Sequence, residues 1–207
     1  QPEADPGLKC MLETQAPVMT IFGKTWDLHV KEILKTTLDE NLRMIEDSIQ
    51  FLKQHVEEVV YDAEHFFDGY KENSDYAMKT ISAALEGGAD CIVLCDTNGG
   101  TLPGEVQRIT RAVSEKFNCH LGMHAHNDSG CAVANTLIAI ENGARHIQGT
   151  INGLGERSGN ADLCTLIADI ELKLHLETIG RDRIKKLREI SLYVSEIANV
   201  HHDPRQP

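Results

Sequence analysis

Five times along this chain, a short β-rich run is followed by a longer segment whose apolar residues recur with helical spacing. The runs lie at residues 18–22, 58–61 and 91–95, in a fourth strand that ends in two histidines, and at 146–151. Strands separated by single helices pair in parallel through right-handed crossovers. The pattern therefore predicts an α/β protein with parallel strands. A doubly wound sheet and a (β/α) barrel both satisfy it, and five units are too few to close an eight-stranded barrel.

Local signals predict several element boundaries. Thr37 and Glu40 are spaced as a capping box at the start of a helix with an apolar stripe. Residues 181–200 are expected to form one further helix. Residues 23–29 and 62–69 are rich in polar side chains and are expected to be connecting loops.

Composition restricts the classes of partner. The formal net charge of -12, without a dense lysine and arginine cluster, argues against nucleic acid, because such binding neutralises phosphates with cations. No apolar run approaches the roughly 20 residues of a membrane span, and the first residues carry no signal segment. We therefore expect no membrane partner and a cytoplasmic location. The six cysteines lie scattered in apolar segments and are expected to be reduced core thiols.

Residues 121–130, LGMHAHNDSG, combine a strand end with two potential metal ligands. His124 and His126 are two residues apart on a predicted strand, so their imidazoles project from the same face. Polar and small residues then break the strand before the next helical segment. This arrangement is typical of a divalent-metal site in an α/β enzyme. A half-exposed surface pair or a hydrogen-bonded core pair is the alternative interpretation.

Further polar residues lie in predicted strand-end loops, where α/β scaffolds usually place their chemistry. Glu64 follows the second strand, Thr97 follows the third, and Asn160 ends a glycine-rich stretch after the fifth. Each has a simpler interpretation: a solvated loop acid, a turn cap and a helix N-cap, respectively. The glycines at 153–159 do not have the spacing of a dinucleotide-binding loop.

Four of these segments resemble one family. They are residues 61–70 (YDAEHFFDGY), 95–100 (CDTNGG), 121–134 with the motif HAHND, and 149–160. They resemble the signatures of the isopropylmalate, homocitrate and citramalate synthases, most of all the citramalate branch. These enzymes share a metal-dependent (β/α) TIM barrel with hydroxymethylglutaryl-CoA lyase. The resemblance covers nearly the whole chain and implies about five of the eight βα units of such a barrel.

The resemblance implies an acyltransferase reaction of the Claisen type. The enolate of acetyl-CoA would attack the ketone of a 2-oxoacid, and the thioester would then be hydrolysed. Pyruvate would give citramalate, a step of branched-chain amino-acid biosynthesis. A divalent metal, Mg²⁺, Mn²⁺ or Zn²⁺, would polarise the ketone. The implied partners are small molecules, with a homodimer for the full-length protein.

Matching the motifs residue by residue implies roles for particular side chains. The implied metal ligands are His124, His126 and Asn160, and the implied catalytic acids are Glu64 and Glu156. The implied substrate-binding residues are Thr97 for the 2-oxoacid carboxylate, Tyr61 as a pocket wall on the strand face of Glu64, and His29. His65, His120 and His146 have no motif support and are expected to be structural.

We expect residues 1–180 to form the partial barrel domain and residues 181–207 to form a C-terminal helix and tail. The family's first strand, with its Asp-Thr-x-x-Arg-Asp-Gly motif, and its regulatory domain have no counterpart here, so the chain is expected to be a truncated fragment that is inactive alone. The alternatives are an isopropylmalate or homocitrate synthase, a metal-dependent hydrolase or lyase barrel, and a non-catalytic truncated product. A lyase of this class would need a cysteine in the glycine-rich loop, and residues 152–160 contain none.

Overall fold

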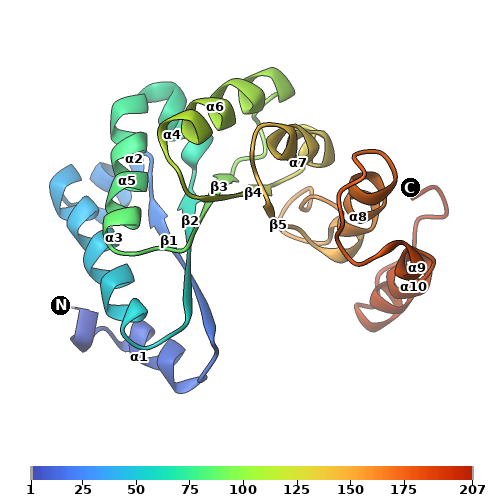
Figure 1. Ribbon diagram of the computed structural model, residues 1–207, viewed down its shortest axis with the longest axis horizontal. Coiled ribbons are helices and arrows are strands. Elements are labelled where there is room, and N and C mark those ends of the chain that lie inside the picture. Colours follow the sequence, from blue (N-terminus) through green and yellow to red (C-terminus); the bar gives the residue numbers. More distant parts are fainter. Residues whose placement is uncertain (1, 207) are drawn as a thin grey trace.

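The computed structural model describes residues 2–206, and within them five strands form one parallel sheet (Figure 1). The strands lie in the order of the chain: β1 (Val18–Lys24), β2 (Glu58–Glu64), β3 (Cys91–Asp96), β4 (His120–Ala125) and β5 (His146–Gln148). The predicted α/β architecture with parallel strands is confirmed. Sequential order without reversal distinguishes this sheet from a doubly wound one and agrees with an arc of a (β/α) barrel.

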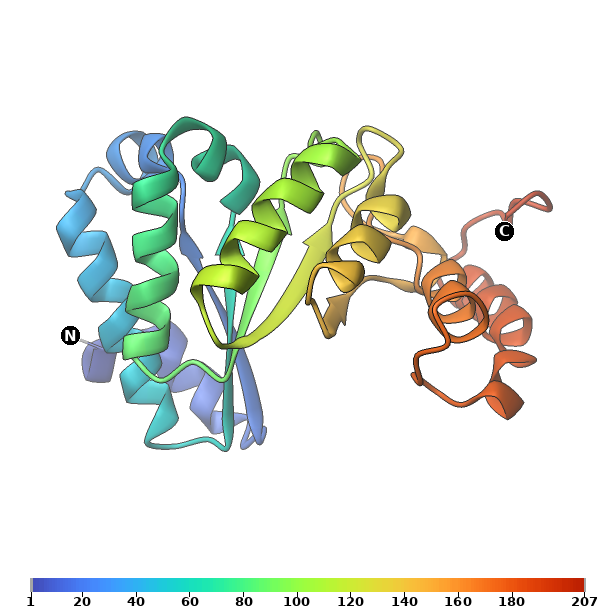
Figure 2. The same cartoon turned by 45° about the horizontal axis from the view of Figure 1, so that its top comes forward.

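Helices cover one side of this curved sheet. In both views α3, α5, α6 and α7 lie one after another along its outer side (Figures 1 and 2). The helices of this layer are α2 (Asp27–His29), α3 (Leu38–Lys53), α4 (Phe66–Glu72), α5 (Ser74–Glu86), α6 (Pro103–Lys116) and α7 (Ala132–Glu141). The remaining elements are η1 (Pro2–Ala4), α1 (Pro6–Glu13), η2 (Val30–Leu34), η3 (Ile151–Gly153), α8 (Leu163–Leu172), α9 (Arg181–Ile184) and α10 (Leu187–Ile197).

The two faces of the sheet carry different side chains because successive residues of a strand alternate in direction. On β2, Val59, Tyr61 and Ala63 belong to the large apolar core shared with the helices. Val60 lies on the opposite, concave face, in a small cluster with cysteine and valine side chains of β3. The concave face of the same strand also carries Asp62, so this side of the sheet combines a few apolar residues with polar groups.

Two local predictions about α3 are confirmed. The Thr37 hydroxyl oxygen accepts a hydrogen bond from the Glu40 backbone N–H at 3.1 Å and caps α3. The stripe of α3 is buried at Ile45, Ile49 and Leu52. No helix within residues 2–206 is both long enough and apolar enough to cross a lipid bilayer.

Other local predictions are wrong. Residues 23–29 are not one loop, because β1 runs to Lys24 and a helical turn begins at Asp27. Residues 62–69 likewise divide between the end of β2 and α4. The fifth strand ends at Gln148 rather than residue 151, and the helix expected over 181–200 is two helices, α9 and α10.

The prediction of core thiols holds for part of the cysteine set only. Cys91, Cys95 and Cys164 are buried, and burial raises the pKa of the Cys91 thiol to about 12. Cys10 is exposed on α1, which makes it an exception to the expected core placement.

Candidate metal and substrate site

Most of the predicted site residues come together at the carboxyl ends of the parallel strands. Glu64 is the last residue of β2, Thr97 directly follows β3, and His124 lies near the end of β4. The loop that leaves β5 returns to the same edge, where Asn160 forms an isolated antiparallel bridge with His126. In a parallel sheet these ends share one edge, which is where α/β enzymes place ligands and substrates.

His124 and His126 lie side by side, with ring centroids 5.1 Å apart. His126 follows the last residue of β4 and is fixed by its backbone N–H, which donates to the Asp96 carbonyl at 3.2 Å. Burial is the largest cause of a lowered pKa at His126, followed by electrostatic effects of the neighbouring His124 ring and the Arg157 guanidinium. A lowered pKa favours the neutral imidazole, which is the form that binds metal.

Two buried polar atoms at this point have no hydrogen-bond partner among the described residues: Nδ1 of His126 and Oδ1 of Asn160. Buried polar atoms are normally paired by hydrogen bonds. Two unpaired atoms on residues that form a β-bridge with each other therefore indicate a place where a ligand could bind. An imidazole nitrogen and an amide oxygen are both ligands of divalent cations. Within residues 2–206 no three His, Cys, Asp or Glu side chains form a metal centre by themselves. The donor set that fits a cation is therefore two histidines and Asn160.

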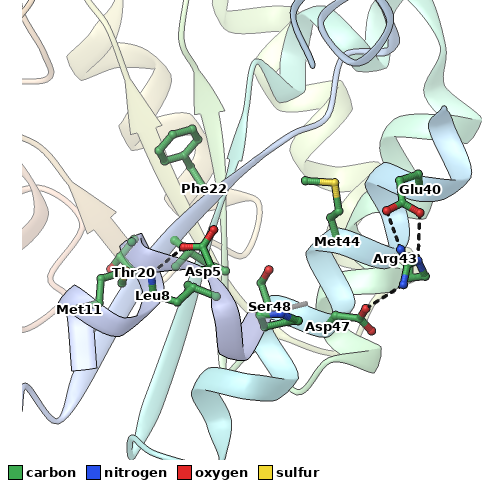
Figure 3. Close-up of a pocket in the computed structure, with 13 residues that line it drawn as sticks. Asp5, Leu8, Met11, Thr20, Phe22, Glu40, Arg43, Met44, Asp47 and Ser48 are labelled. Carbon is green, nitrogen blue, oxygen red and sulfur yellow. Dashed lines mark hydrogen bonds and ion pairs between the residues drawn. The ribbon is translucent and has the colours of Figure 1, made fainter. Parts of the chain in front are cut away.

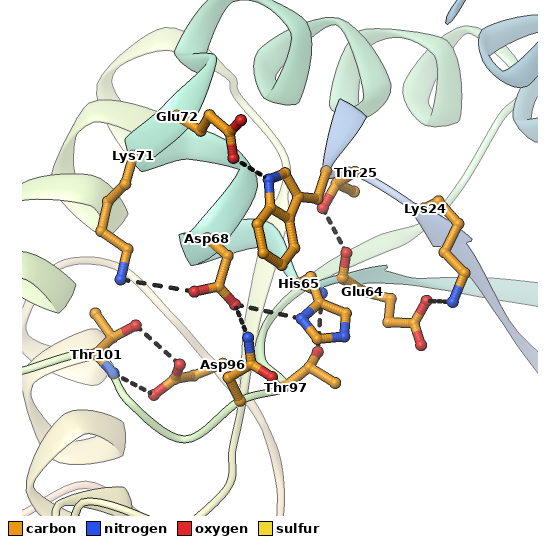
Figure 4. A network of polar contacts seen from close by, with 12 residues as sticks. Lys24, Thr25, Glu64, His65, Asp68, Lys71, Glu72, Asp96, Thr97 and Thr101 are labelled. Carbon is orange, nitrogen blue, oxygen red and sulfur yellow. Dashed lines mark hydrogen bonds and ion pairs between the residues drawn. The ribbon is translucent and has the colours of Figure 1, made fainter. Parts of the chain in front are cut away.

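Glu64 is held at the end of β2 by an ion pair with Lys24, the last residue of β1 (Figure 4). The side chains of Glu64 and Lys24 are 23% and 17% exposed, so the pair is only partly open to solvent. The Glu64 backbone carbonyl also accepts a hydrogen bond from the Thr25 hydroxyl at 2.6 Å. These contacts fix the end of β2 to the end of β1 and give the carboxylate a defined position.

The Thr97 hydroxyl oxygen accepts a hydrogen bond from the His65 backbone N–H at 2.8 Å (Figure 4). His65 has a positive φ of 57°, so this contact stabilises a left-handed residue between β2 and α4. The Thr97 hydroxyl can still donate its own proton. Among the described residues no atom accepts a hydrogen bond from it. The expected turn-capping role of Thr97 and a donor role toward a substrate are therefore compatible.

An aromatic and charged cluster borders the site. The His29 and His65 rings have centroids 4.4 Å apart, and Trp26 packs on both. Burial, then the charge of His65, lowers the pKa of His29. Burial acts to raise the pKa of Asp68, but the hydrogen bond with His65 and the nearby cation Lys71 outweigh it and lower that pKa. His65 has no motif support and is expected to be structural, whereas the structure places it at the border of the site, beside His29 and Asp68.

The predicted position of Tyr61 is wrong. Tyr61 and Glu64 are three residues apart on a strand, which places their side chains on opposite faces. Tyr61 is fully buried in the core between the sheet and the helices, where its ring lies against Gly23. It therefore cannot line a pocket on the face of Glu64.

The structure also places the three other histidine and acid residues selected from sequence. The Glu156 side chain is 77% exposed on the glycine-rich loop, 3.5 Å from an Arg157 nitrogen, and its catalytic role stays a prediction. His120 is the first residue of β4, at the end of the strand opposite the histidine pair, whereas His146 begins the short strand β5 and pairs with Gly122 in the middle of β4.

Three residues that sequence analysis did not select complete the geometry: Lys24, Asp62 and Gln148. Lys24 was assigned to a loop, and its pairing with Glu64 depends on the register of β1 with β2. Asp62 and Gln148 do not belong to a metal-ligand motif in the sequence. The fold brings them together, and Gln148 Nε2 donates a hydrogen bond to Asp62 Oδ1. The alternation rule applied to β2 would have placed Asp62 on the face of Glu64.

A separate groove of about 670 Å³ lies on the other edge of the molecule, between the N-terminal segment, β1 and α3 (Figure 3). Phe22, Met44 and the Arg43 ion pairs with Glu40 and Asp47 line it. None of the predicted site residues belongs to this groove.

Comparison with known proteins identifies relatives over nearly the whole chain. The family model described as HMGL-like matches residues 4–193. The chain is 55% identical over 197 residues to (R)-citramalate synthase of Aquifex aeolicus, covering 95% of this chain and 37% of that protein. It is 54% identical over 205 residues to (R)-citramalate synthase of Geobacter sulfurreducens, covering 99% and 39%. A homocitrate synthase of Saccharolobus islandicus is 35% identical over 196 residues, covering 94% and 41%.

Solved structures agree with the fold. The HMG-CoA lyase of Bacillus subtilis superposes with a TM-score of 0.81 at 21% identity, covering 96% of this chain and 69% of that chain. The carboxyl transferase domain of Rhizobium etli pyruvate carboxylase gives a TM-score of 0.71 at 16% identity, covering 97% and 32%. The chain spans about two fifths of the length of the curated synthases.

Proposed function

Because this chain belongs to the HMGL-like family, we propose that the whole protein is an acyltransferase that condenses acetyl-CoA with pyruvate to give citramalate. The observation that carries the proposal is the identity of 55% and 54% with two (R)-citramalate synthases over nearly all of this chain. The homocitrate synthase is much more distant at 35%. We therefore propose pyruvate as the 2-oxoacid substrate, because the citramalate synthases are the more similar relatives.

The reaction requires three chemical changes. A proton leaves the methyl group of acetyl-CoA, and the resulting enolate carbon forms a bond to the ketone carbon of pyruvate. The ketone oxygen then carries negative charge and takes up a proton. Water finally attacks the thioester carbonyl, which releases CoA as the thiol and leaves citramalate.

We assign the metal to His124, His126 and Asn160, because His126 and Asn160 present buried polar atoms without a hydrogen-bond partner in residues 2–206. A divalent cation bound there would act as a Lewis acid on the ketone and its developing alkoxide. The donor types accept Mg²⁺, Mn²⁺ or Zn²⁺. The neutral imidazoles would hold the ion, and the Asn160 amide would add an oxygen ligand.

Glu64 is the residue we assign to proton transfer or substrate orientation, because it lies at the carboxyl end of the sheet with its carboxylate fixed by Lys24. Thr97 is assigned to the carboxylate of the 2-oxoacid, since its hydroxyl has already accepted a backbone hydrogen bond and retains a proton to donate. His29 stays the least supported substrate contact, at the border of the site.

The test measures thiol release from acetyl-CoA by the whole protein in Mn²⁺, with pyruvate, 2-oxoisovalerate or 2-oxoglutarate as the second substrate. We expect pyruvate to give the fastest release and citramalate to be the product by mass spectrometry. His124→Ala should abolish release, whereas His120→Ala, at the other end of β4, should retain it.

A preference for 2-oxoisovalerate would indicate an isopropylmalate synthase instead. A preference for 2-oxoglutarate would indicate a homocitrate synthase. Absence of thiol release from a folded protein with all three acids would contradict a synthase function. We also propose that the whole protein is a homodimer, which sedimentation equilibrium measures directly.

A further inference from the structure

We infer that Gln148 and Asp62 are positioning residues that hold His124 in the tautomer required for metal binding. Gln148 Oε1 lies 2.7 Å from His124 Nδ1, and Gln148 Nε2 donates to Asp62 Oδ1 at 2.9 Å. The three side chains therefore form a chain of hydrogen bonds from β2 to β4 by way of β5. The inference rests on the proposed metal site and adds two residues to it.

The direction of this chain is set at Asp62. A carboxylate oxygen accepts hydrogen bonds, so the side of the Gln148 amide that faces Asp62 must be the NH₂ group. The amide oxygen then faces His124, and it can only accept. His124 Nδ1 must therefore carry the proton, and the lone pair of the neutral ring lies on Nε2. Metal-binding histidines are commonly oriented through a hydrogen bond at their other ring nitrogen.

The strand register explains how residues on β2 and β5 can meet. Asp62 pairs with Val93 on β3, and Val93 pairs with Gly122 on β4. Val93 and Gly122 offer no polar side-chain atom. The His146 ring lies beside Gly122 and acts on Asp62 through its charge, but among residues 2–206 Asp62 and the Gln148 amide make no side-chain hydrogen bonds other than those of this chain. A Cβ atom at Gly122 would lie 2.9 Å from a methyl group of Val93, 2.9 Å from the His146 carbonyl oxygen and 3.1 Å from the His146 ring, so a side chain at this position would clash with both neighbours.

His126 does not share this support, because its Nδ1 has no partner among residues 2–206. The two histidines therefore differ: Gln148 fixes the tautomer of His124, whereas His126 is fixed by its backbone. A change at Gln148 or Asp62 should affect His124 selectively, which separates a positioning role from a general loss of structure.

The experiment compares four forms of the whole protein: wild type, Gln148→Leu, Asp62→Asn, and Gln107→Leu as a control. Gln107 is exposed on α6 and makes no recorded side-chain contact. Asp62→Asn does not touch His124, but it permits the Gln148 amide to turn over and present NH₂ to the ring. The first readout is the tautomer of His124 without metal, from long-range ¹H–¹⁵N spectra of histidine-labelled protein, assigned with His124→Ala.

We expect His124 to be protonated at Nδ1 in wild type and in Gln107→Leu, and to acquire the Nε2-protonated form in the other two variants. The second readout is the dissociation constant of Mn²⁺, from the electron paramagnetic resonance signal of the free ion. It should rise roughly 10- to 100-fold in Gln148→Leu and Asp62→Asn. The His126 signals and the unfolding temperature without metal should stay close to wild type in Asp62→Asn.

The inference is overturned if His124 keeps the Nδ1-protonated form in both variants, or if the spectra of wild type show the Nε2-protonated form. Failure of wild type to bind Mn²⁺ would instead reject the proposed metal site, while the tautomer spectra would still decide the role of Gln148. The two failures are therefore distinguishable.

Discussion

The unpaired buried atoms of His126 and Asn160 are expected to lower the stability of the free protein, and the proposed metal ion would remove that cost. A buried polar atom without a partner costs about 1–3 kcal/mol, and His126 Nδ1 is such an atom. A ligand that binds only the folded state stabilises it by about 2.7 kcal/mol at 100 times its dissociation constant. Stability measured with and without metal therefore reports the function of this pair.

The first prediction concerns His126→Leu. Without metal, this substitution should change the free energy of unfolding by less than about 1 kcal/mol, because it removes an unsatisfied polar atom together with some packing. With saturating Mn²⁺, wild type should show a rise in unfolding temperature by calorimetry, and the variant should lack it. His120→Ala serves as the control and should retain that rise. An equal rise in His126→Leu would contradict the ligand assignment.

Glu64 and Lys24 carry the second prediction. Glu64→Gln removes the charge that can accept a proton, and its kcat should fall by about 10²-fold or more with a smaller change in KM. Lys24→Met leaves the carboxylate in place without its ion pair, so the expected loss is smaller. Steady-state thiol release measures both. Glu86→Gln and Lys79→Met are exposed controls on α5 that should keep wild-type kcat.

At the scale of the element, α4 packs closely against the segment that follows β1. A Cβ atom on Gly69 would lie 2.6 Å from the Thr25 carbonyl oxygen and 3.0 Å from the Trp26 Cα. Both contacts are with backbone, which cannot move aside as a flexible side chain can. The close packing at Gly69 thus fixes the backbone of Thr25 and Trp26, and the Trp26 ring packs on His29 and His65.

The third prediction follows from this contact. Gly69→Ala should lower the free energy of unfolding by about 1–3 kcal/mol, because the methyl group overpacks a backbone contact. Gly104→Ala is the matched control, since a Cβ at that helical glycine would meet nothing within 4 Å. It should leave stability unchanged or raise it by up to about 1 kcal/mol. Urea denaturation of both variants tests the pair, and equal stabilities would refute the close packing.

Glu171 organises the loop between α8 and α9. One carboxylate oxygen accepts hydrogen bonds from the Thr178 hydroxyl at 2.6 Å and from the backbone N–H groups of Thr178, Ile179 and Gly180 at 3.1, 2.7 and 2.7 Å. These bonds, led by that of the Thr178 side chain, lower the pKa of Glu171. The charged form is therefore the one that holds the loop.

The fourth prediction is the pH dependence of this contribution. A carboxyl group with a lowered folded-state pKa stabilises the protein above its unfolded pKa of about 4.3, and this stabilisation is lost as the pH falls through the folded value. Glu171→Gln should therefore be less stable than wild type at pH 7, with a difference that shrinks in acid. Urea denaturation across a pH series measures it. Glu177→Gln, exposed in the same loop, should follow wild type at every pH.

The elements were predictable from sequence where local chemistry decides them. The Thr37 cap and the stripe of α3 depend on residues within one helix, and both were found. The fifth strand was predicted too long, because Asn152 adopts a positive φ of 63° and the chain turns into η3. Residues 27–34 were missed as helical because the segment is short, with one turn of α-helix followed by a wider π turn.

The candidate site was predictable from sequence only where its residues lie in motifs, and the roles of these residues stay predictions. His124, His126 and Asn160 were selected together, and the bridge between His126 and Asn160 brings their segments into contact. Gln148, Asp62 and Lys24 were not selected, since each acts through a neighbour on another strand and no spacing in the sequence records that contact.

At the scale of the whole molecule, the C-terminal helices and the glycine-rich loop are packed against each other. Leu187 of α10 is 8% exposed, and α10 packs on both α8 and η3. Asn152 in η3 donates to the Ser191 carbonyl at 2.9 Å and to the Ser195 hydroxyl at 3.0 Å. The Ser191 hydroxyl donates back to the Asn152 side-chain oxygen at 2.6 Å. The loop that ends at Asn160 thus depends on a helix beyond residue 181.

The last prediction is that α10 and this loop open together. Asn152→Ala removes these hydrogen bonds and places alanine at a positive φ, so it should speed amide hydrogen exchange in residues 151–160 and 187–197 alike, and weaken Mn²⁺ binding through Asn160. Asn199→Ala is the matched control, because Asn199 also has a positive φ of 54° but makes no recorded side-chain contact. Asn199→Ala also places alanine at a positive φ, but it removes none of the hydrogen bonds that Asn152 makes with α10. Amide exchange in residues 151–160 should therefore not change. Faster exchange confined to α10 in Asn152→Ala would mean that residues 181–207 open independently of the site, and the proposed boundary at residue 180 would then separate two cooperative units.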